Sequence, residues 1–260
     1  MNGINVTETI GILGAGQLTT HVVRGLCRAG PRLDIIVSPR NVEVSAALAA
    51  DHSVIIAKDN QDVVNRARMI FACLPASAGK QLLSELTFRH GQSVCSAMAG
   101  INHDTVAEVV APAAACLTMM PGASNALGLG PCLLFPDNSE WRKLLEPLGQ
   151  VFAFETKTQF DNAAVFGAFS GASYFLLKHI ADWFEEQGIE SGTARQLVAE
   201  TMAGNATVLK QSSQDWDHIM KSVATPGGVT EQMVESLKDA GGLDSWKDGL
   251  NAVLIRMSKP

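Results

Sequence analysis

Residues 9–19 decide the fold, and they read Thr9-Ile10-Gly11-Ile12-Leu13-Gly14-Ala15-Gly16-Gln17-Leu18-Thr19. A short apolar run, predicted to be a strand over Thr9–Leu13, ends at Gly14, and a helical pattern begins at Leu18. A glycine-rich turn between a strand and a helix is typical of a dinucleotide-binding unit, with Gly14 permitting the tight turn and Gly16 admitting a pyrophosphate. Thr19 replaces the usual third glycine, so the motif alone is only moderately specific.

Outward from this turn, the first half of the chain alternates short apolar runs with helical stretches. This pattern is typical of a parallel sheet covered by helices on both faces, with right-handed connections between neighbouring strands. The expected strands are Thr9–Leu13, Asp34–Val37, Val54–Ile56, Met69–Cys73, Ser93–Ala97, Ala115–Thr118, Cys132–Phe135 and Val151–Phe154. The expected helices include Leu18–Ala29, Val42–Ala50 with Asn41 as its cap, Gly79–Leu86 and Glu140–Leu148.

After Lys157 the strand signals stop and only helical patterns follow. They cover Gln159–Gln187, Ser191–Lys210, Thr230–Ala240 and Leu243–Met257. We therefore expect an α/β protein, with an N-terminal Rossmann-type doubly wound sheet in residues 1–157 and an all-helical C-terminal domain in residues 158–260. Apolar residues lie on nearly every face of the first long helix, which predicts a homodimer or higher homo-oligomer through the C-terminal helices.

Composition narrows the classes of partner. Among 260 residues, 20 Lys and Arg stand against 26 Asp and Glu, so a broad basic face for nucleic acid is not expected. Five cysteines without a C-x-x-C pair argue against disulfides and a metal site, and Cys73, Cys95 and Cys116 are expected to be small buried residues. The uncharged run 109–136 contains prolines that would break a membrane helix, and no signal peptide is visible. We expect a cytoplasmic protein that binds small molecules.

The nucleotide preference is read at the end of the second predicted strand, where the sequence is Val37-Ser38-Pro39-Arg40-Asn41. No carboxylate is present here to accept the ribose hydroxyls of NAD, whereas Ser38 and Arg40 are suited to a 2′-phosphate. The sequence therefore predicts NADPH over NADH, with a solvated loop arginine as the alternative reading of Arg40. The expected coenzyme contacts so far are Gly11, Gly14, Gly16, Gln17, Leu18, Ser38 and Arg40.

Loops after the fourth and fifth predicted strands extend the coenzyme site. Leu74-Pro75 and Met98-Ala99-Gly100 follow neighbouring strands, and their carboxyl ends should meet at one edge of the sheet.

A second informative stretch is Thr225-Pro226-Gly227-Gly228-Val229-Thr230. Proline followed by two glycines presets a tight turn whose backbone N–H groups are free of side-chain cover, and Thr230 sits where a helix begins. Such a turn suits a small carboxylate.

Five motifs together resemble the pyrroline-5-carboxylate reductase family in order and spacing over nearly the whole chain. They are the glycine turn, Ala97-Met98-Ala99-Gly100-Ile101, Met119-Met120-Pro121, Phe169-Ser170-Gly171-Ala172-Ser173-Tyr174 and the stretch 225–230. The resemblance implies a Rossmann domain, a helical substrate and dimerisation domain, and reduction of a cyclic imine by NADPH. Its most direct form is conversion of pyrroline-5-carboxylate to proline, as in proline biosynthesis.

The resemblance also implies roles for residues of the helical half. The substrate carboxylate is expected on the amides around Gly227, Gly228 and Thr230, in the turn that Thr225 opens, with the Thr230 hydroxyl on the ring nitrogen as the catalytic group. The alternative is that Thr230 only caps its helix.

Two further assignments follow from the same resemblance. The small residues Ser170, Gly171 and Ser173 are expected to make room for the substrate ring, or else to allow close helix packing. Asn60 is expected near the adenosine ribose, or else as a helix cap.

Several positions depart from the family pattern and leave the exact imine open. Leu74 replaces a lysine, Gly122 an asparagine, Ala172 and Ser173 a proline and an alanine, and Lys238 a glutamate. The alternatives are a reductase of a different imino acid and a non-catalytic NADPH-binding sensor. A β-hydroxyacid dehydrogenase is disfavoured, because Lys178 lacks the asparagine expected one helical turn later.

Overall fold

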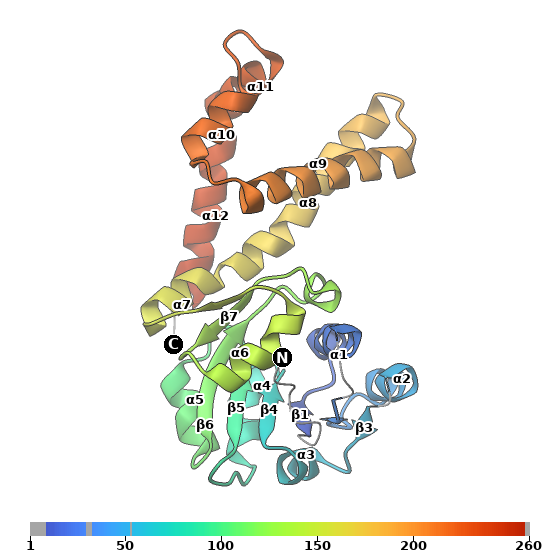
Figure 1. Ribbon diagram of the computed structural model, residues 1–260, viewed down its shortest axis with the longest axis vertical. Helices are drawn as coiled ribbons and strands as arrows, with labels where there is room; N and C mark the ends of the chain where they lie inside the picture. The colour runs from blue at the N-terminus through green and yellow to red at the C-terminus, as the bar shows by residue number, and fades with distance from the viewer. Residues whose placement is uncertain (1–8, 30–32, 53, 258–260) are drawn as a thin grey trace. The chain divides into compact units, whose positions relative to one another are not determined.

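The computed structural model describes residues 9–29, 33–52 and 54–257 (Figure 1). The chain divides into two units, and each is described by itself. The first unit takes the chain up to Gly167 together with Met257, and the second unit is Ala168–Arg256. The predicted boundary at residue 157 precedes this division because the helix α7 (Lys157–Ala164) contacts the strand β7 and lies in the first unit.

A sheet of eight strands forms the centre of the first unit, in the order β3-β2-β1-β4-β5-β6-β7-β8. Their bounds are β1 Ile10–Leu13, β2 Ile35–Val37, β3 Ile55–Ile56, β4 Met69–Ala72, β5 Ser93–Ser96, β6 Ala114–Met119, β7 Cys132–Phe135 and β8 Val151–Ala153. All neighbouring pairs are parallel except β6 with β7. The strand order turns from β1 to β4, which creates the crevice at which such sheets bind ligands.

Helices cover both faces of this sheet, as the alternation of apolar runs and helical patterns predicted. Side chains of successive strand residues point to opposite faces, so Met69 and Phe71 of β4 join one buried cluster while Ile70 and Ala72 join the other. The first cluster includes α1 (Gln17–Ala29), α2 (Val42–His52), α6 (Ser139–Leu145) and the 3₁₀ turn η2 (Glu146–Leu148). The second includes α3 (Asn60–Arg66), α4 (Ala76–Ser84), α5 (His103–Val110) and α7.

Trp141 fixes α6 on the first of these faces. Its ring is fully buried and meets Phe71 edge to face, with centroids 5.6 Å apart. The indole N–H donates to the hydroxyl of Ser93 on β5 over 2.7 Å, which satisfies a donor that burial would otherwise leave unpaired.

The second unit is helical throughout its described secondary structure. It contains most of α8 (Phe166–Glu186), then α9 (Ser191–Gln211), α10 (Trp216–Val223), α11 (Val229–Asp239) and α12 (Gly242–Met257). The single helix predicted over residues 159–187 is wrong: the chain forms α7 and α8, which are interrupted at Val165. Packing explains the break, since Phe160 and Ala164 of α7 are buried in the cluster under β7.

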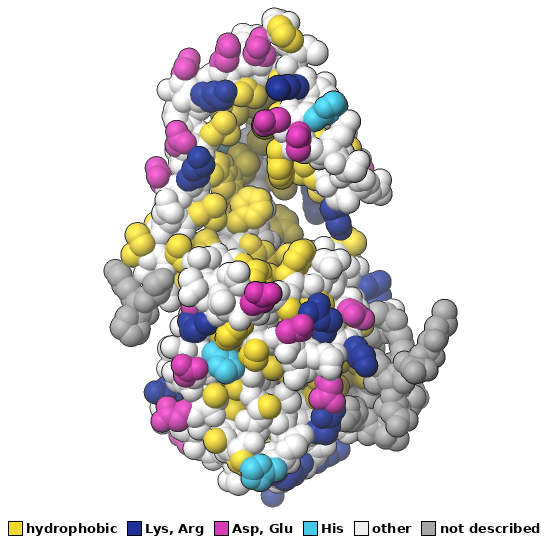
Figure 2. Space-filling view, turned by 60° about the vertical axis from the view of Figure 1, so that its left-hand side comes forward, with side chains coloured by type: hydrophobic (Ala, Val, Ile, Leu, Met, Phe, Trp, Pro, Cys, Tyr) yellow, Lys and Arg dark blue, Asp and Glu magenta, His cyan; other side chains and the backbone are white. Residues whose placement is uncertain are grey.

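Few side chains of the second unit are buried. Among the described residues 168–256, the buried apolar side chains are Ala181, Ala194 and Val198, all of modest size. Figure 2 shows hydrophobic side chains at the surface of the helical unit. The large exposed ones include Phe169, Tyr174, Phe175, Trp183, Trp216, Val223, Val229 and Met233. Exposed apolar area on this scale marks an interaction surface, as the pattern of the long helix predicted.

Two sequence expectations concern membranes and metals. Within the described ranges, no helix has both the length and the apolar composition that a membrane span requires. The same ranges contain no group of three or more His, Cys, Asp or Glu side chains placed to hold a metal ion.

Candidate active site

A crevice of about 690 Å³ opens beyond the carboxyl ends of β1, β2, β4 and β5. Its lining consists of residues 14–18 after β1, 40–43 after β2, 73–75 after β4, and Ala97 after β5. Of the predicted coenzyme residues, the crevice brings together Gly14, Gly16, Gln17, Leu18, Arg40, Leu74 and Pro75.

Gly14 is required by both conformation and space. Its φ of 97° lies in the left-handed region, and a Cβ at this position would come within 2.3 Å of the Cys73 carbonyl oxygen. Gly16 differs, because apart from its own chain neighbours no described atom lies within 4 Å of the place a Cβ would take. The exposed backbone of Gly16 at the start of α1 therefore leaves room for an anion to approach the helix N-terminus.

Two hydroxyl groups hold this turn in place. The Gly14 N–H donates to Ser38 Oγ over 2.8 Å, and Thr19 Oγ1 donates to the Gly14 carbonyl oxygen over 2.6 Å. Both hydroxyl residues are fully buried. Thr19, the residue in place of the third glycine, thus ties α1 back to the turn by a hydrogen bond.

Of the predicted pair Ser38 and Arg40, only Arg40 lines the crevice. Ser38 is buried beneath the turn and is not part of the crevice lining, so in the structure its hydroxyl supports Gly14. Arg40 is exposed and lines the crevice. The lining also includes Glu43, in the first turn of α2, which the sequence analysis missed. The signal was available, because the first turn of a helix after a strand commonly faces the same edge of the sheet.

Gly11 and Asn60 lie outside the crevice lining. Gly11 is inside β1, where a Cβ would meet Ala67 at 2.7 Å, so its small size lets α3 approach the sheet. Asn60 is the first residue of α3, and the cap of that helix is Asp59, whose carboxylate accepts from the Asp62 N–H over 2.8 Å. The alternative reading of Asn60 as the cap is therefore wrong.

The three residues predicted after β5 also lie outside the lining. Met98 is buried against α4, where a Cβ on Gly79 would overlap its sulfur. Ala99 and Gly100 are exposed in the loop that follows.

The predicted substrate turn lies in the second unit, immediately before α11. The Gly228 N–H donates to the Thr225 carbonyl oxygen over 2.9 Å, and Gly227 has φ 75°, which with Pro226 before it fits a type II turn. A Cβ on Gly228 would come within 2.8 Å of Thr225 Oγ1, so neither glycine tolerates a side chain easily.

The expectation that these amides are free of side-chain cover is wrong for Gly227. Its N–H donates to Glu231 Oε2 over 2.7 Å. Gly228 is the N-cap of α11, and Glu231 is the third residue of the helix, from which a carboxylate can reach back to the amides before it. The amides of Val229, Thr230 and Glu231 precede the first helical hydrogen bond, from the Gln232 N–H to the Gly228 carbonyl oxygen.

Thr230 is the second residue of α11, and its side chain is exposed. The alternative reading of Thr230 as the helix cap is wrong, because the cap is Gly228. Within the part of the chain that the structure describes, the Thr230 hydroxyl has no hydrogen-bond partner, so it is available to a ligand.

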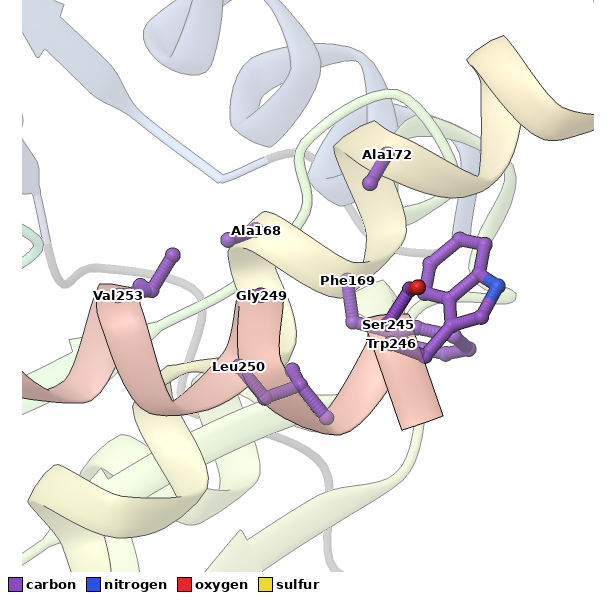
Figure 3. A pocket seen from close by; sticks show the side chains of 8 residues that line it. All are labelled: Ala168, Phe169, Ala172, Ser245, Trp246, Gly249, Leu250 and Val253. Atoms are coloured by element: carbon purple, nitrogen blue, oxygen red, sulfur yellow. The ribbon is translucent and has the colours of Figure 1, made fainter. Parts of the chain in front are cut away.

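The small-residue stretch lies on α8. Ser173 Oγ donates to the Ser170 carbonyl oxygen over 2.8 Å, and Gly171 is exposed with open space around it. Ala172, beside them, lines an apolar pocket of about 320 Å³ between α8 and α12 (Figure 3). Phe169 and Trp246 meet edge to face at this pocket, with ring centroids 5.9 Å apart.

Four cysteines of the first unit, Cys73, Cys95, Cys116 and Cys132, have thiols whose pKa is raised. Burial raises the pKa of Cys73, Cys116 and Cys132 to about 12 and that of Cys95 well above its usual value. Cys95 and Cys116 are buried, as expected, whereas Cys73 is half-buried and lines the crevice.

The crevice where the strand order turns from β1 to β4, together with its glycine turn, identifies an NAD(P)H-dependent oxidoreductase with a Rossmann-type domain. Residues 9–100 match the family model described as NADP oxidoreductase coenzyme F420-dependent, and residues 158–259 match the model for pyrroline-5-carboxylate reductase dimerisation. The C-terminal part of the chain thus matches the dimerisation region of pyrroline-5-carboxylate reductases, and the whole chain is similar to proteins of that name.

Relatives and solved structures cover almost the full length of the chain. Pyrroline-5-carboxylate reductase 2 of Bacillus subtilis is 26% identical over 245 residues, which is 90% of this chain and 88% of that protein. The reductase structure from Streptococcus pyogenes has a TM-score of 0.85 at 21% identity, covering 96% of this chain and 98% of the other. The Plasmodium falciparum pyrroline carboxylate reductase with NADP bound has a TM-score of 0.86 at 15% identity, covering 97% and 98%.

Proposed function

We propose that this chain reduces pyrroline-5-carboxylate to proline with NADPH as the hydride donor. The observation that carries the proposal is the presence of the Thr225–Gly228 turn before α11 in a chain whose coenzyme crevice is fully formed. Curated relatives with this activity in their names support the same assignment.

The first unit has the task of binding the coenzyme. The open space at Gly16 and the N-terminus of α1 suit a pyrophosphate, and Leu74 and Pro75 supply an apolar wall. When bound, the coenzyme supplies the hydride from its nicotinamide ring. The residues of the chain hold and orient it, and they exclude water from the reacting atoms.

The turn of the second unit has the task of binding the imine. The amides at the start of α11, together with the turn that Thr225 opens, hold the substrate carboxylate, and the Thr230 hydroxyl hydrogen-bonds the ring nitrogen. Ser170, Gly171 and Ser173 leave room for the ring. The imine nitrogen takes a proton from bulk water before binding, the hydride adds to the resulting iminium carbon, and a hydroxyl at the nitrogen stabilises the developing amine.

Thr230→Ala tests the catalytic assignment. Turnover of pyrroline-5-carboxylate should fall on the order of 10² to 10³-fold, because the hydrogen-bond donor to the ring nitrogen is lost. The melting temperature should stay close to that of the wild type, since Gly228 and not Thr230 caps α11. Ser236→Ala on the same helix is the control, and normal turnover in Thr230→Ala would refute the assignment.

Arg40→Gln tests the coenzyme preference. Loss of a charge-assisted contact worth about 1.5 to 3 kcal/mol should weaken NADPH binding by roughly ten- to a hundredfold and leave NADH binding unchanged. Fluorescence titration of both coenzymes measures this, with the exposed Arg24→Gln on α1 as the control. Only NADPH carries the 2′-phosphate, so equal weakening of NADPH and NADH binding would refute a contact between Arg40 and that group.

The departures at Leu74, Gly122, Ala172 and Lys238 favour a second candidate, the reduction of a different imino acid. A panel of cyclic imines mixed with protein and NADPH, followed by the loss of absorbance of the coenzyme, separates the two candidates. Tight NADPH binding without oxidation by any imine would instead support a non-catalytic sensor.

A further inference from the structure

A carboxylate of the chain itself occupies a donor of the proposed substrate turn. Glu231 Oε2 accepts from the Gly227 N–H over 2.7 Å, and the Gly227 amide is one of those assigned to the substrate carboxylate. We propose that Glu231 is a specificity-determining residue, whose carboxylate competes with the carboxylate of an imine for the Gly227 N–H. This inference rests on the proposed function and deepens it.

The contact is local and follows from the sequence of the turn. Gly227 has φ 75°, its N–H points to the Glu231 carboxylate, and Glu231 lies four residues later in the first turn of the helix. A negative charge near a helix N-terminus is favoured by the macrodipole, so this effect and the hydrogen bond from Gly227 both stabilise the position of the Glu231 side chain. Glu231 is partly buried, whereas Gly227 and Thr230 are exposed to a ligand.

The second glycine of the turn offers a ligand no free amide. The Gly228 N–H is already used by the Thr225 carbonyl oxygen over 2.9 Å. An incoming carboxylate that uses an amide of the turn itself must therefore displace Glu231 from Gly227. Otherwise it binds only the amides of the first turn of α11, beside a second negative charge.

Either route weakens the binding of imines that carry a carboxylate and leaves the binding of imines without one unaffected. The side chain of Glu231 thus sets the ratio of the two substrate classes. Its effect belongs to KM, because the competition is for binding and not for the hydride transfer.

The experiment compares the full-length wild type with Glu231→Ala, Glu231→Gln and Glu235→Ala. Glu235 is exposed on the same helix, one turn further on, and is the matched control. The substrates are pyrroline-5-carboxylate and 1-pyrroline, which has the same ring without the carboxylate. KM and kcat are measured for both at saturating NADPH.

In Glu231→Ala, the KM for pyrroline-5-carboxylate should fall roughly fivefold, a change of about 1 kcal/mol, while the KM for 1-pyrroline and both kcat values stay within about twofold. Glu231→Gln keeps the length of the side chain and removes its charge, so it should show a smaller change in the same direction. It also serves if loss of the helix contact in the alanine variant impairs folding.

Two outcomes overturn the inference. If the Glu231 variants match Glu235→Ala in their KM for pyrroline-5-carboxylate, or change both substrates equally, Glu231 does not compete with the carboxylate, and the proposed function stands. If the wild type oxidises NADPH with neither imine, the proposed function fails first and this inference fails with it.

Discussion

At the residue scale, two glycines two positions apart serve different purposes. Gly14 has no room for a Cβ because of the Cys73 carbonyl oxygen, and its φ is positive. Gly16 has ample room within the described protein. One glycine is therefore needed for folding of the turn, and the other leaves space for a ligand.

Replacing each glycine by alanine should separate these roles. Gly14→Ala should lower the free energy of unfolding by about 1 to 3 kcal/mol and weaken NADPH binding, because strained backbone and crowding are both introduced. Gly16→Ala should leave the melting temperature unchanged and weaken NADPH binding by tenfold or more. Thermal melts and coenzyme titrations measure both effects. A stable Gly14→Ala variant with normal affinity would contradict the described turn.

The need for glycine at position 14 could be predicted from the sequence because its cause is local, whereas the contact of Gly16 with a pyrophosphate stays a prediction. Ser38 and Glu43 were harder to place. The first lies under the turn and the second in the crevice, depending on where β2 and α2 sit against β1. The contact of Glu231 with the Gly227 amide could not be predicted, because the spacing of four residues permits such a hydrogen bond without requiring it.

At the element scale, the strands followed from their apolar runs, and each of the eight was predicted within one or two residues. The direction of β7 did not follow, because a buried apolar run reads the same whichever way the strand runs. The separation of α7 from α8 also depends on tertiary packing beneath β7, which helical periodicity does not report. The helix α10 was not predicted.

The reactivity of the thiols tests whether the cysteines on β6 and β7 are buried. A thiol with a pKa of about 12, as for Cys116 on β6 and Cys132 on β7, is thiolate in roughly one molecule in ten thousand at pH 8. Native protein should therefore react quickly with an aromatic disulfide reagent only at the exposed Cys27. Cys27→Ser should abolish this fast phase, whereas two or more fast thiols would contradict the buried positions.

The same thiols make stability depend on pH. Their pKa is raised in the folded protein relative to about 8.5 in an unfolded chain, so the folded state holds these protons more tightly. The contribution is fully present below about pH 8.5, and it is lost as the pH rises toward about 12.

At the scale of the whole molecule, the two units differ in how they are stabilised. The first has large side chains buried on both faces of its sheet, such as Trp141, Phe71 and Leu83. In the described part of the second, the buried apolar residues are two alanines and a valine. A helical unit of this size needs more buried surface, which a second copy of the chain would supply through the dimerisation region.

Phe175→Asp tests this association. Phe175 on α8 is 82% exposed, so the change should have little effect within one copy. It should instead shift the solution mass from at least twice 27.6 kDa toward the mass of one chain, because a charge is placed in an apolar interface. Leu129→Asp, at a site 69% exposed in the first unit, is the control. A wild type that sediments as a single chain at micromolar concentration would contradict the proposed association.

The sparse interior of the helical unit has a consequence for life in the cell. If two copies complete each other's interior, the C-terminal half cannot finish folding until a newly made chain meets another. Dilution then favours the incompletely folded single chain, and a high concentration of the chain favours the folded assembly. A drop in expression would thus lower the surviving fraction of the protein as well as its amount.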